Sequence, residues 1–240
     1  MSNTFKLIAP MYNASDTLGR MLHSLYGQSY ENWHLFLIDD VSSNEHREKC
    51  RSILSSFEQM TPGKVSVVWN EEKKWEVANV LLGISKCDEE DIVCRIDADD
   101  WLVDLDALAI IDHFYDRTQC DILWTAHRWG LSDKNISGHM DNNVDPYSHP
   151  WVSSHFKTLR KRLLSSVSDE NYRGEDGQYI RRAGDQAIYL PALHNSKSRV
   201  FLPRVMYHYT INDVPETYMT DDARFQRDEA LFLRRRGYVK

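Results

Sequence analysis

The sequence lacks several features that would each point to a particular class of protein. Its 240 residues include only 4 cysteines, without a CxxC motif or another paired spacing: Cys50, Cys87, Cys94 and Cys120. This excludes a disulfide scaffold and a zinc ribbon, and we expect reduced thiols in a cytoplasmic protein. No stretch approaches the ~20 apolar residues of a transmembrane helix. The N-terminal segment lacks the basic start and apolar core of a signal peptide. We therefore expect no integral membrane segment.

Two phosphate-binding motifs are also missing. The first expected strand-to-helix turn has no GxGxxG, which argues against a dinucleotide bound as in Rossmann dehydrogenases, and no GxxxxGK[ST] of a P-loop enzyme occurs. The charge balance, 29 lysines and arginines against 36 aspartates and glutamates, gives −7 and argues against a dedicated nucleic-acid binder. A composition of 42% hydrophobic and 27% charged residues is that of an ordinary globular protein.

Short apolar runs alternate with helical patterns over the first half of the chain. Residues 5–9, 35–38, 65–69, 92–96 and 122–125 are predicted to be strands, because polar or turn residues bound each run. Helical periodicity lies between them: from Ser15, the expected N-cap, over 45–57, over 76–85, and after Asp104. This alternation predicts an α/β fold with a mostly parallel central sheet and helices on both faces.

The second half shows a less regular pattern. We expect a long surface loop over residues 127–150, a basic helix over 154–164, a polar segment over 165–178 and a helix from Asp185 to about residue 195. Short strands are expected over 200–202 and 205–209, and a charged helix over about 221–236. Neither a repeat nor a linker interrupts the chain, so residues 1–240 are predicted to form a single domain.

Polar side chains follow four of the predicted strands, at the edge where parallel sheets bind ligands. They occur at residues 10–13, at Asp39-Asp40, at Asn70-Glu71 and in the run 97–100. Carboxylates cannot hold an anionic diphosphate directly, but they can hold a divalent cation that bridges to it. Asp97 and Asp99 suit this, since residues i and i+2 of an extended segment point the same way. Asp-Asp pairs at strand ends can also be simple helix caps or turn formers, and for Asp39-Asp40 the two interpretations are about equal.

The combination of motifs resembles an inverting family-2 glycosyltransferase of the GT-A fold. The matching segments are IAPMYN at residues 8–13, LYGQSYENW at 25–33, LIDDVS at 37–42 and RIDADD at 95–100, together with Asn70, Asn79 and Gly83. Their order and spacing cover residues 5–105. The resemblance implies an enzyme that transfers a sugar from a nucleotide-sugar donor, with a UDP-sugar favoured, to an acceptor hydroxyl. Residues 1–126 would then bind the nucleotide sugar and residues 127–240 the acceptor.

The resemblance also implies roles for individual residues. Pro10, Tyr12 and Asn13 would line the nucleotide pocket, Asp39 or Asp40 would bind the base or ribose, Asp97 would contact the nucleotide, and Asp99 would coordinate Mn²⁺ or Mg²⁺ on the diphosphate. Two departures affect the donor site. Val41 stands where family members commonly have glycine, and the glycines expected before Asn79 are replaced by a segment that contains Trp75.

Inversion by direct displacement needs a carboxylate that takes the proton of the acceptor hydroxyl. Two candidates precede helical sequence in the second half, Asp176 in RGEDG and Asp185 in AGDQA. The Glu175-Asp176 pair resembles the family signature more literally. Asp185 opens an apolar helical pattern, which would fix its position, although a capping role alone would also explain it. We favour Asp185 as the base and retain Asp176 as the alternative.

The acceptor side carries weaker signals. His208 can complete a metal shell, although a structural or acceptor-side role explains it better. His155 can face the acceptor, although a surface role explains it at least as well. Trp124, Trp129 and Trp151 are candidates for a sugar-stacking platform, although large aromatic residues are more often core. The acceptor would be a carbohydrate, a lipid-linked sugar or another hydroxyl, with nucleic acid less favoured. A sugar-phosphate nucleotidyltransferase and an inactive glycan-binding protein on the same fold remain alternative functions.

Overall fold

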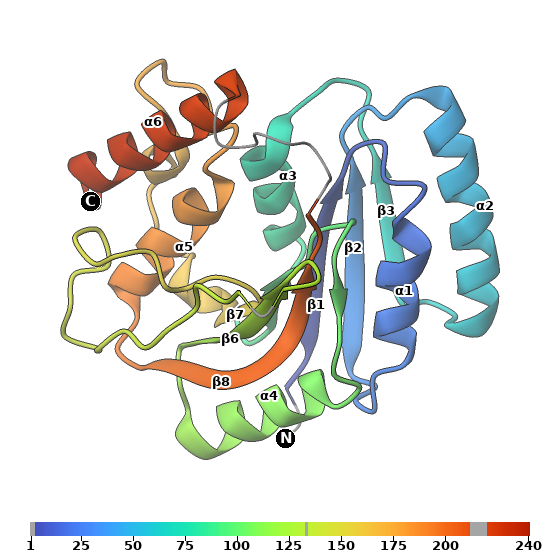
Figure 1. Ribbon diagram of the computed structural model, residues 1–240, viewed down its shortest axis with the longest axis horizontal. Coiled ribbons are helices and arrows are strands. Elements are labelled where there is room, and N and C mark those ends of the chain that lie inside the picture. The colour runs from blue at the N-terminus through green and yellow to red at the C-terminus, as the bar shows by residue number, and fades with distance from the viewer. Residues whose placement is uncertain (1–2, 133, 212–219) are drawn as a thin grey trace.

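A single curved sheet runs through the protein (Figure 1). The computed structural model describes residues 3–132, 134–211 and 220–240. The strands are β1 (Phe5–Met11), β2 (Trp33–Asp39), β3 (Val65–Trp69), β4 (Ile92–Arg95), β5 (Trp101–Leu102), β6 (Ile122–Trp129), β7 (Lys157–Arg160) and β8 (Arg199–Tyr209). Their order across the sheet is β3-β2-β1-β4-β7-β6-β8-β5. The pairings β1–β2, β1–β4, β2–β3 and β6–β8 are parallel, whereas β7 and β5 pair antiparallel with their neighbours.

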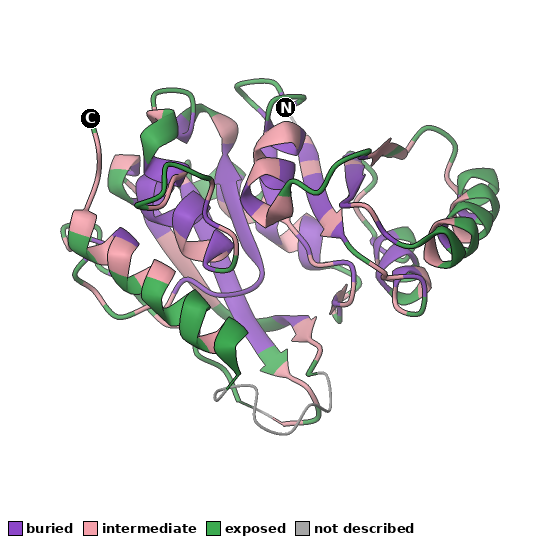
Figure 2. Ribbon diagram, turned by 90° about the horizontal axis from the view of Figure 1, so that it is seen from above, coloured by how far each residue is buried: buried purple, intermediate pink, exposed green. Residues whose placement is uncertain are grey.

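Helices cover both faces of the sheet. They are α1 (Leu18–Tyr26), α2 (Asn44–Met60), α3 (Trp75–Ile84), α4 (Ala107–Thr118), α5 (Gly184–Asn195) and α6 (Asp221–Arg236), with short 3₁₀ turns at Lys161–Leu163 and Asp169–Tyr172. Alternate side chains of each strand point to opposite faces. Accordingly, Leu7 packs in one core with α1, α2 and α4, while Ile8 packs in another with α3, α5 and α6. Figure 2 shows buried strands between helices whose outer faces are exposed.

The predicted α/β fold with a mostly parallel sheet and helices on both faces, in a single domain, is confirmed. The expected strands and helices of the first half are present, with shifted ends. Helix α1 begins at Leu18 rather than near Ser15, and its cap residue Thr17 makes no side-chain capping bond. Strand β5, which is only two residues long, was not expected. In the described ranges, no helix combines the length and apolar character needed to cross a bilayer.

The prediction of a basic helix over residues 154–164 is wrong. Residues 157–160 form strand β7, which is hydrogen-bonded between β4 and β6 and is buried along its whole length. Lys157 and Arg160 therefore do not lie on a solvated face, whereas Arg162 is exposed. Lys157 is 1% exposed and its Nζ contacts a carboxylate, while Arg160 donates from Nε to the Cys120 carbonyl at 3.0 Å. Pairing with two distant strands, which local periodicity does not report, decides the structure here.

Two further boundaries in the second half differ from the expectation. The two short strands expected over 200–209 are one strand, β8, whose pairing with β6 shifts register around Ala126. Strand β6 continues to Trp129, so the loop of the second half begins at Gly130 and leads to β7. Residue 133 of the expected loop lies outside the described residues.

Candidate functional site

The carboxyl ends of β1, β2 and β4 meet at one edge of the sheet and are tied together by side chains. The backbone N–H of Asn13 donates to the Ser42 hydroxyl at 2.7 Å, which joins the segments after β1 and β2. The Thr17 hydroxyl donates to the Ala98 carbonyl at 3.0 Å, which joins the segment after β1 to that after β4. Asn13 has φ of 53°, a left-handed conformation that asparagine tolerates. The expected polar edge is therefore a connected structure.

Asp39 is fully buried at the end of β2. One carboxylate oxygen accepts from Arg47 at 2.6 Å and from the backbone N–H of Ser42 at 3.2 Å. The other oxygen, Oδ1, has no hydrogen-bond partner within the described part of the chain. A buried carboxylate oxygen without a partner is unfavourable unless a ligand supplies a donor. Asp39 thus retains one buried acceptor atom that a ligand could use.

Asp40, unlike Asp39, bonds backbone groups with both of its carboxylate oxygens. Its two carboxylate oxygens accept from the backbone N–H groups of Lys74 at 2.7 Å and Trp75 at 3.0 Å. These bonds hold Trp75 at φ of 64°, which is unusual for an aromatic residue. They also fix Lys73, whose Nζ lies 3.6 Å from the centroid of the Tyr12 ring and 4.8 Å from that of Trp75. The segment that replaces the expected glycines therefore lies beside the predicted nucleotide pocket.

Pro10 and Tyr12 lie on either side of the end of β1. Pro10 is within the strand, paired with Ile38. Tyr12 follows the strand and is 55% exposed, so one face of its ring is accessible to a ligand. Both residues therefore lie at the polar edge formed by the segments that follow β1 and β2.

Residues 97–100 form a turn, which corrects the expected extended conformation. The backbone N–H of Asp100 donates to the Asp97 carbonyl at 3.0 Å. Ligand atoms of Asp97, Asp100 and His155 lie within 4.8 Å of one another. Asp99 is not in this group, and its carbonyl accepts from the Thr210 hydroxyl at 2.5 Å. The premise of an extended segment is therefore wrong, whereas the assignment of Asp97 to the nucleotide and of Asp99 to the metal stays a prediction.

The electrostatics of this group favour a cation. Burial, together with the neighbouring charges of Asp97 and Asp99, raises the pKa of Asp100 to about 8. Its Oδ2 atom is buried without a partner among the described residues. Burial also lowers the pKa of His155 well below its usual value, so the imidazole is neutral and can act as a ligand. Two carboxylates and one imidazole fit Mn²⁺, and with water ligands they also fit Mg²⁺.

Arg95, the last residue of β4, forms the centre of an ion-pair network that was not expected from the sequence. Its guanidinium lies 2.8 Å from Glu76 and 2.7 Å from Asp97, and it donates to Oδ1 of Asp185. Lys157 Nζ donates to Oδ2 of Asp185 at 2.7 Å. Burial, followed by the charge of Arg95, lowers the pKa of Lys157 well below its usual value. The network joins α3, β4, β7 and α5.

Asp185 and Asp176 occupy different environments. Asp185 lies in the first turn of α5, one residue after Gly184, and its side chain is 25% exposed. It is not the N-cap, since that position is Ala183. Asp176 lies in a surface turn, 62% exposed, where its Oδ1 accepts from the backbone N–H of Gln178 at 2.9 Å. Through Arg95, only Asp185 is connected to Asp97.

The tryptophans suggested for sugar stacking and the histidine suggested for the metal lie in different environments. Trp124 is fully buried and donates from its indole to the Gly138 carbonyl at 3.0 Å, so its suggested role as a sugar platform is wrong. Trp129 and Trp151 remain partly exposed. His208 stacks on Trp101 at 3.7 Å between ring centroids and is not in the group formed by Asp97 and its neighbours.

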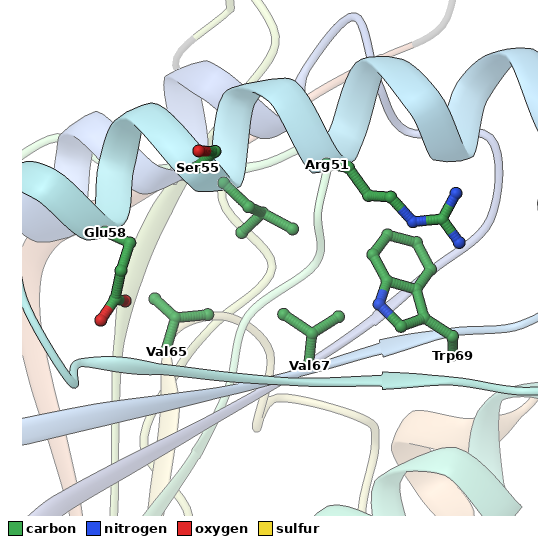
Figure 3. A pocket seen from close by; sticks show the side chains of 7 residues that line it. Arg51, Ser55, Glu58, Val65, Val67 and Trp69 are labelled. Atoms are coloured by element: carbon green, nitrogen blue, oxygen red, sulfur yellow. The ribbon is translucent and has the colours of Figure 1, made fainter.

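A surface hollow of about 290 Å³ lies elsewhere, between α2 and the edge strand β3. Figure 3 shows Arg51, Ser55 and Glu58 of α2 facing Val65, Val67 and Trp69 of β3. The side chain of Arg51 lies over the Trp69 ring, 4.8 Å from its centroid. This hollow contains none of the clustered carboxylates and is distinct from the candidate site.

Some functional residues could have been found from the sequence. Arg95 is a charged residue at the end of an otherwise apolar strand, directly before the apolar Ile96, which is a sign of a buried ion pair. Gly184 precedes Asp185 because a Cβ there would lie 2.2 Å from Glu76 Oε1. Lys157 carries no such signal, because its burial depends on the long-range pairing of β7.

Comparisons with known proteins agree with this geometry. The family model described as "Glycosyl transferase family 2" matches residues 7–174. The chain is 23% identical over 197 residues to "Glycosyltransferase GlyG" of Streptococcus pneumoniae serotype 4, covering 74% of this chain and 64% of that protein.

Solved structures show the same fold. S. aureus TarS in complex with UDP-GlcNAc has a TM-score of 0.68 at 17% identity, covering 90% of this chain and 61% of that one. The mannosyltransferase PcManGT from Pyrobaculum calidifontis, in complex with GDP-Man and Mn²⁺, has a TM-score of 0.60 at 14% identity, covering 89% and 58%. The chain therefore spans less than two thirds of the length of each of these proteins. With 168 of its 240 residues inside the family match (7–174), the chain belongs to glycosyl transferase family 2 and has the GT-A type of fold.

Proposed function

We propose that the protein is a metal-dependent glycosyltransferase that moves a sugar from a nucleotide-sugar donor to an acceptor hydroxyl with inversion at the anomeric carbon. The observation that carries this proposal is the group of Asp97, Asp100 and His155 at the carboxyl end of β4, with a buried Asp100 oxygen that has no partner among the described residues. Such a group fits a cation on a diphosphate. Family membership supports the same reaction class.

The donor would bind across the ends of β1 and β2. Oδ1 of Asp39 would accept a hydrogen bond from the base or ribose, because it is the acceptor left without a partner there. Tyr12 would stack on the base, while Pro10 and Asn13 would shape the pocket. A UDP-sugar is the favoured donor, since the related fold of TarS was solved with UDP-GlcNAc. Asp40 would act indirectly, by holding Trp75 beside the pocket.

Asp97, Asp100 and His155 would hold the cation, with Asp99 as the alternative ligand expected from the motif. Mn²⁺ or Mg²⁺ would supply neutralisation of the negative charge that develops on the leaving diphosphate. The protein's own contribution is to keep these side chains close together before the cation binds. PcManGT, which shares the fold, was solved with Mn²⁺.

Asp185 would be the base. Each carboxylate oxygen of Asp185 can accept two hydrogen bonds. Oδ1 accepts one from Arg95, and Oδ2 accepts one from Lys157. One acceptor position per oxygen remains for the acceptor hydroxyl. The hydroxyl proton would move to Asp185 as the oxygen attacks the anomeric carbon from the side opposite the leaving diphosphate. Inversion follows from this single displacement.

The acceptor would bind to residues 127–240, where the partly exposed Trp129 and Trp151 offer rings for stacking. A carbohydrate, a lipid-linked sugar or another hydroxyl compound fits this proposal. A cytoplasmic location remains a prediction, consistent with four buried free cysteines.

A thermal-shift screen against UDP-, GDP-, CDP- and dTDP-sugars, with and without Mn²⁺, tests the proposal. We expect stabilisation by one nucleotide class, in the presence of Mn²⁺, that is absent in Asp97→Asn. The released product is then analysed: a glycosyltransferase forms a nucleoside diphosphate, whereas a nucleotidyltransferase running towards the sugar phosphate consumes pyrophosphate. Binding of a donor without any turnover would favour the inactive glycan-binding alternative.

A further inference from the structure

Three carboxylates from different segments converge on one guanidinium. Glu76 comes from α3, Asp97 follows β4, and Asp185 comes from α5, and all three contact Arg95. The Arg95 side chain is only 10% exposed, so water competes little for these contacts. The donor half and the acceptor half of the site therefore meet at a single side chain.

The three carboxylates bind to the two terminal nitrogens of the planar Arg95 guanidinium. One end of the guanidinium, Nη2, binds Asp97 at 2.7 Å, while Nη1 binds Glu76 at 2.8 Å and also donates to Asp185. A planar fork can hold two carboxylates in a fixed mutual orientation, whereas a lysine ammonium is a point charge on a flexible stem.

Two basic side chains donate to the Asp185 carboxylate, one to each oxygen. Arg95 binds Oδ1 and Lys157 binds Oδ2, so rotation of the carboxylate breaks one contact or the other. Glu76 braces Arg95 in turn, because its carboxylate packs directly against Gly184 at the start of α5. Arg95, Lys157 and Glu76 thus fix the carboxylate of Asp185 relative to that of Asp97.

We propose that Arg95 is a positioning residue that sets the distance between Asp185 and Asp97, and with it the alignment of acceptor and donor. This inference rests on the proposed function, in which Asp185 is the base and Asp97 belongs to the donor site. A misplacement of about 1 Å in such a geometry can lower a rate by about 10²-fold. Loss of the fork should therefore lower kcat while the donor still binds.

Arg95→Lys tests the proposal, with Arg199→Lys as the matched control. Arg199 is also buried, but it bonds the Ser196 hydroxyl and the carbonyls of residues 141, 144 and 193, away from the carboxylate cluster. With UDP-GlcNAc or GDP-mannose and Mn²⁺, we expect kcat for release of nucleoside diphosphate to fall about 10²-fold in Arg95→Lys, with the donor Kd changed by less than about threefold. Arg199→Lys should lower Tm but leave kcat within about threefold. An equal loss of kcat in both variants, or an unchanged kcat in Arg95→Lys, would overturn the proposal.

Crystal structures of the wild type and Arg95→Lys test the positioning role of Arg95 independently of any enzymatic activity. The Asp185 carboxylate should rotate or move by about 1 Å relative to Asp97. If it stays in place, positioning by Arg95 is refuted whatever the activity. If the wild type turns over neither donor, the proposed function is in question, while the displacement still decides the role of Arg95. Should Arg95→Lys fail to fold, Glu76→Gln gives a milder loosening of Arg95, with an expected loss in kcat of about tenfold.

Discussion

Gly184 allows α5 to approach α3 so closely that any larger residue should disturb the network around Arg95. A Cβ at this position would lie 2.2 Å from Oε1, 2.4 Å from Cδ and 2.8 Å from Oε2 of Glu76. In Gly184→Ala, the Glu76 carboxylate must leave Arg95 or α5 must shift. Overpacking of this kind costs about 1–3 kcal/mol. We expect the free energy of unfolding to fall by about 2 kcal/mol, which lowers Tm by about 4–8 °C for a chain of this size.

Urea denaturation and calorimetry measure this change, and Gly19→Ala is the control. Gly19 is also helical, but a Cβ there meets nothing within 4 Å, so alanine should stabilise the protein by up to about 1 kcal/mol. Shortening Glu76 to aspartate should relieve the clash, so Gly184→Ala/Glu76→Asp should be about 1 kcal/mol more stable than additivity predicts. A Gly184→Ala variant as stable as the wild type, or strict additivity in the double variant, would refute the close packing of α5 on Glu76.

Three further predictions concern individual side chains. Asp185→Asn should lower the rate of nucleoside diphosphate release about 10²–10⁴-fold, and Asp176→Asn less than about tenfold; the reverse ranking would assign the base to Asp176. Asp100→Asn should weaken Mn²⁺ binding in the presence of UDP, measured by titration calorimetry, by at least about tenfold. A larger loss in Asp99→Asn would restore the ligand expected from the motif. Burial lowers the pKa of His127 to about 4, so below its usual pKa of 6.5 the unfolded chain binds a proton that the folded one does not. The free energy of unfolding should therefore fall, by up to about 3 kcal/mol, as pH drops from 6.5 to 4, and His127→Gln should flatten this slope; equal slopes in urea titrations of both proteins would contradict it.

The first half of the fold could be predicted because its information is local. Residues such as Leu18 and Met21 repeat at helical spacing and are buried as expected. The strands around them are short apolar runs bounded by polar residues, and parallel strands connected by helices leave little choice of architecture. The edge at which ligands would bind follows from the same rule.

The second half could not be predicted in the same way because its strands are defined by distant partners. Strand β7 contains Lys157 and Arg160, which look like surface residues until β4 and β6 enclose them. The buried Lys157 is paired with Asp185, from a helix 28 residues away in sequence. No local pattern reports such a partner.

In the candidate site, too, residues whose position follows from local sequence were predicted, and residues placed by distant pairing were not. Asp39 and Asp97 were identified because they follow predicted strands directly. The position of Asp100 was missed, since an extended 97–99 segment would point it away, whereas the turn brings it close to Asp97 and His155. His155 was considered only for the acceptor, because its approach to the acidic run depends on the pairing of β7 with β4.

Titration calorimetry of UDP into the wild type and Asp97→Asn, each with Mn²⁺ and with EDTA, tests the central claim most directly. If the ends of β1, β2 and β4 form a cation-dependent nucleotide site, UDP should bind the wild type with Mn²⁺ at least about tenfold more tightly than with EDTA, and Asp97→Asn should lose that difference. Equal affinity for UDP with Mn²⁺ and EDTA in the wild type, or a Mn²⁺ effect that survives in Asp97→Asn, would contradict the account.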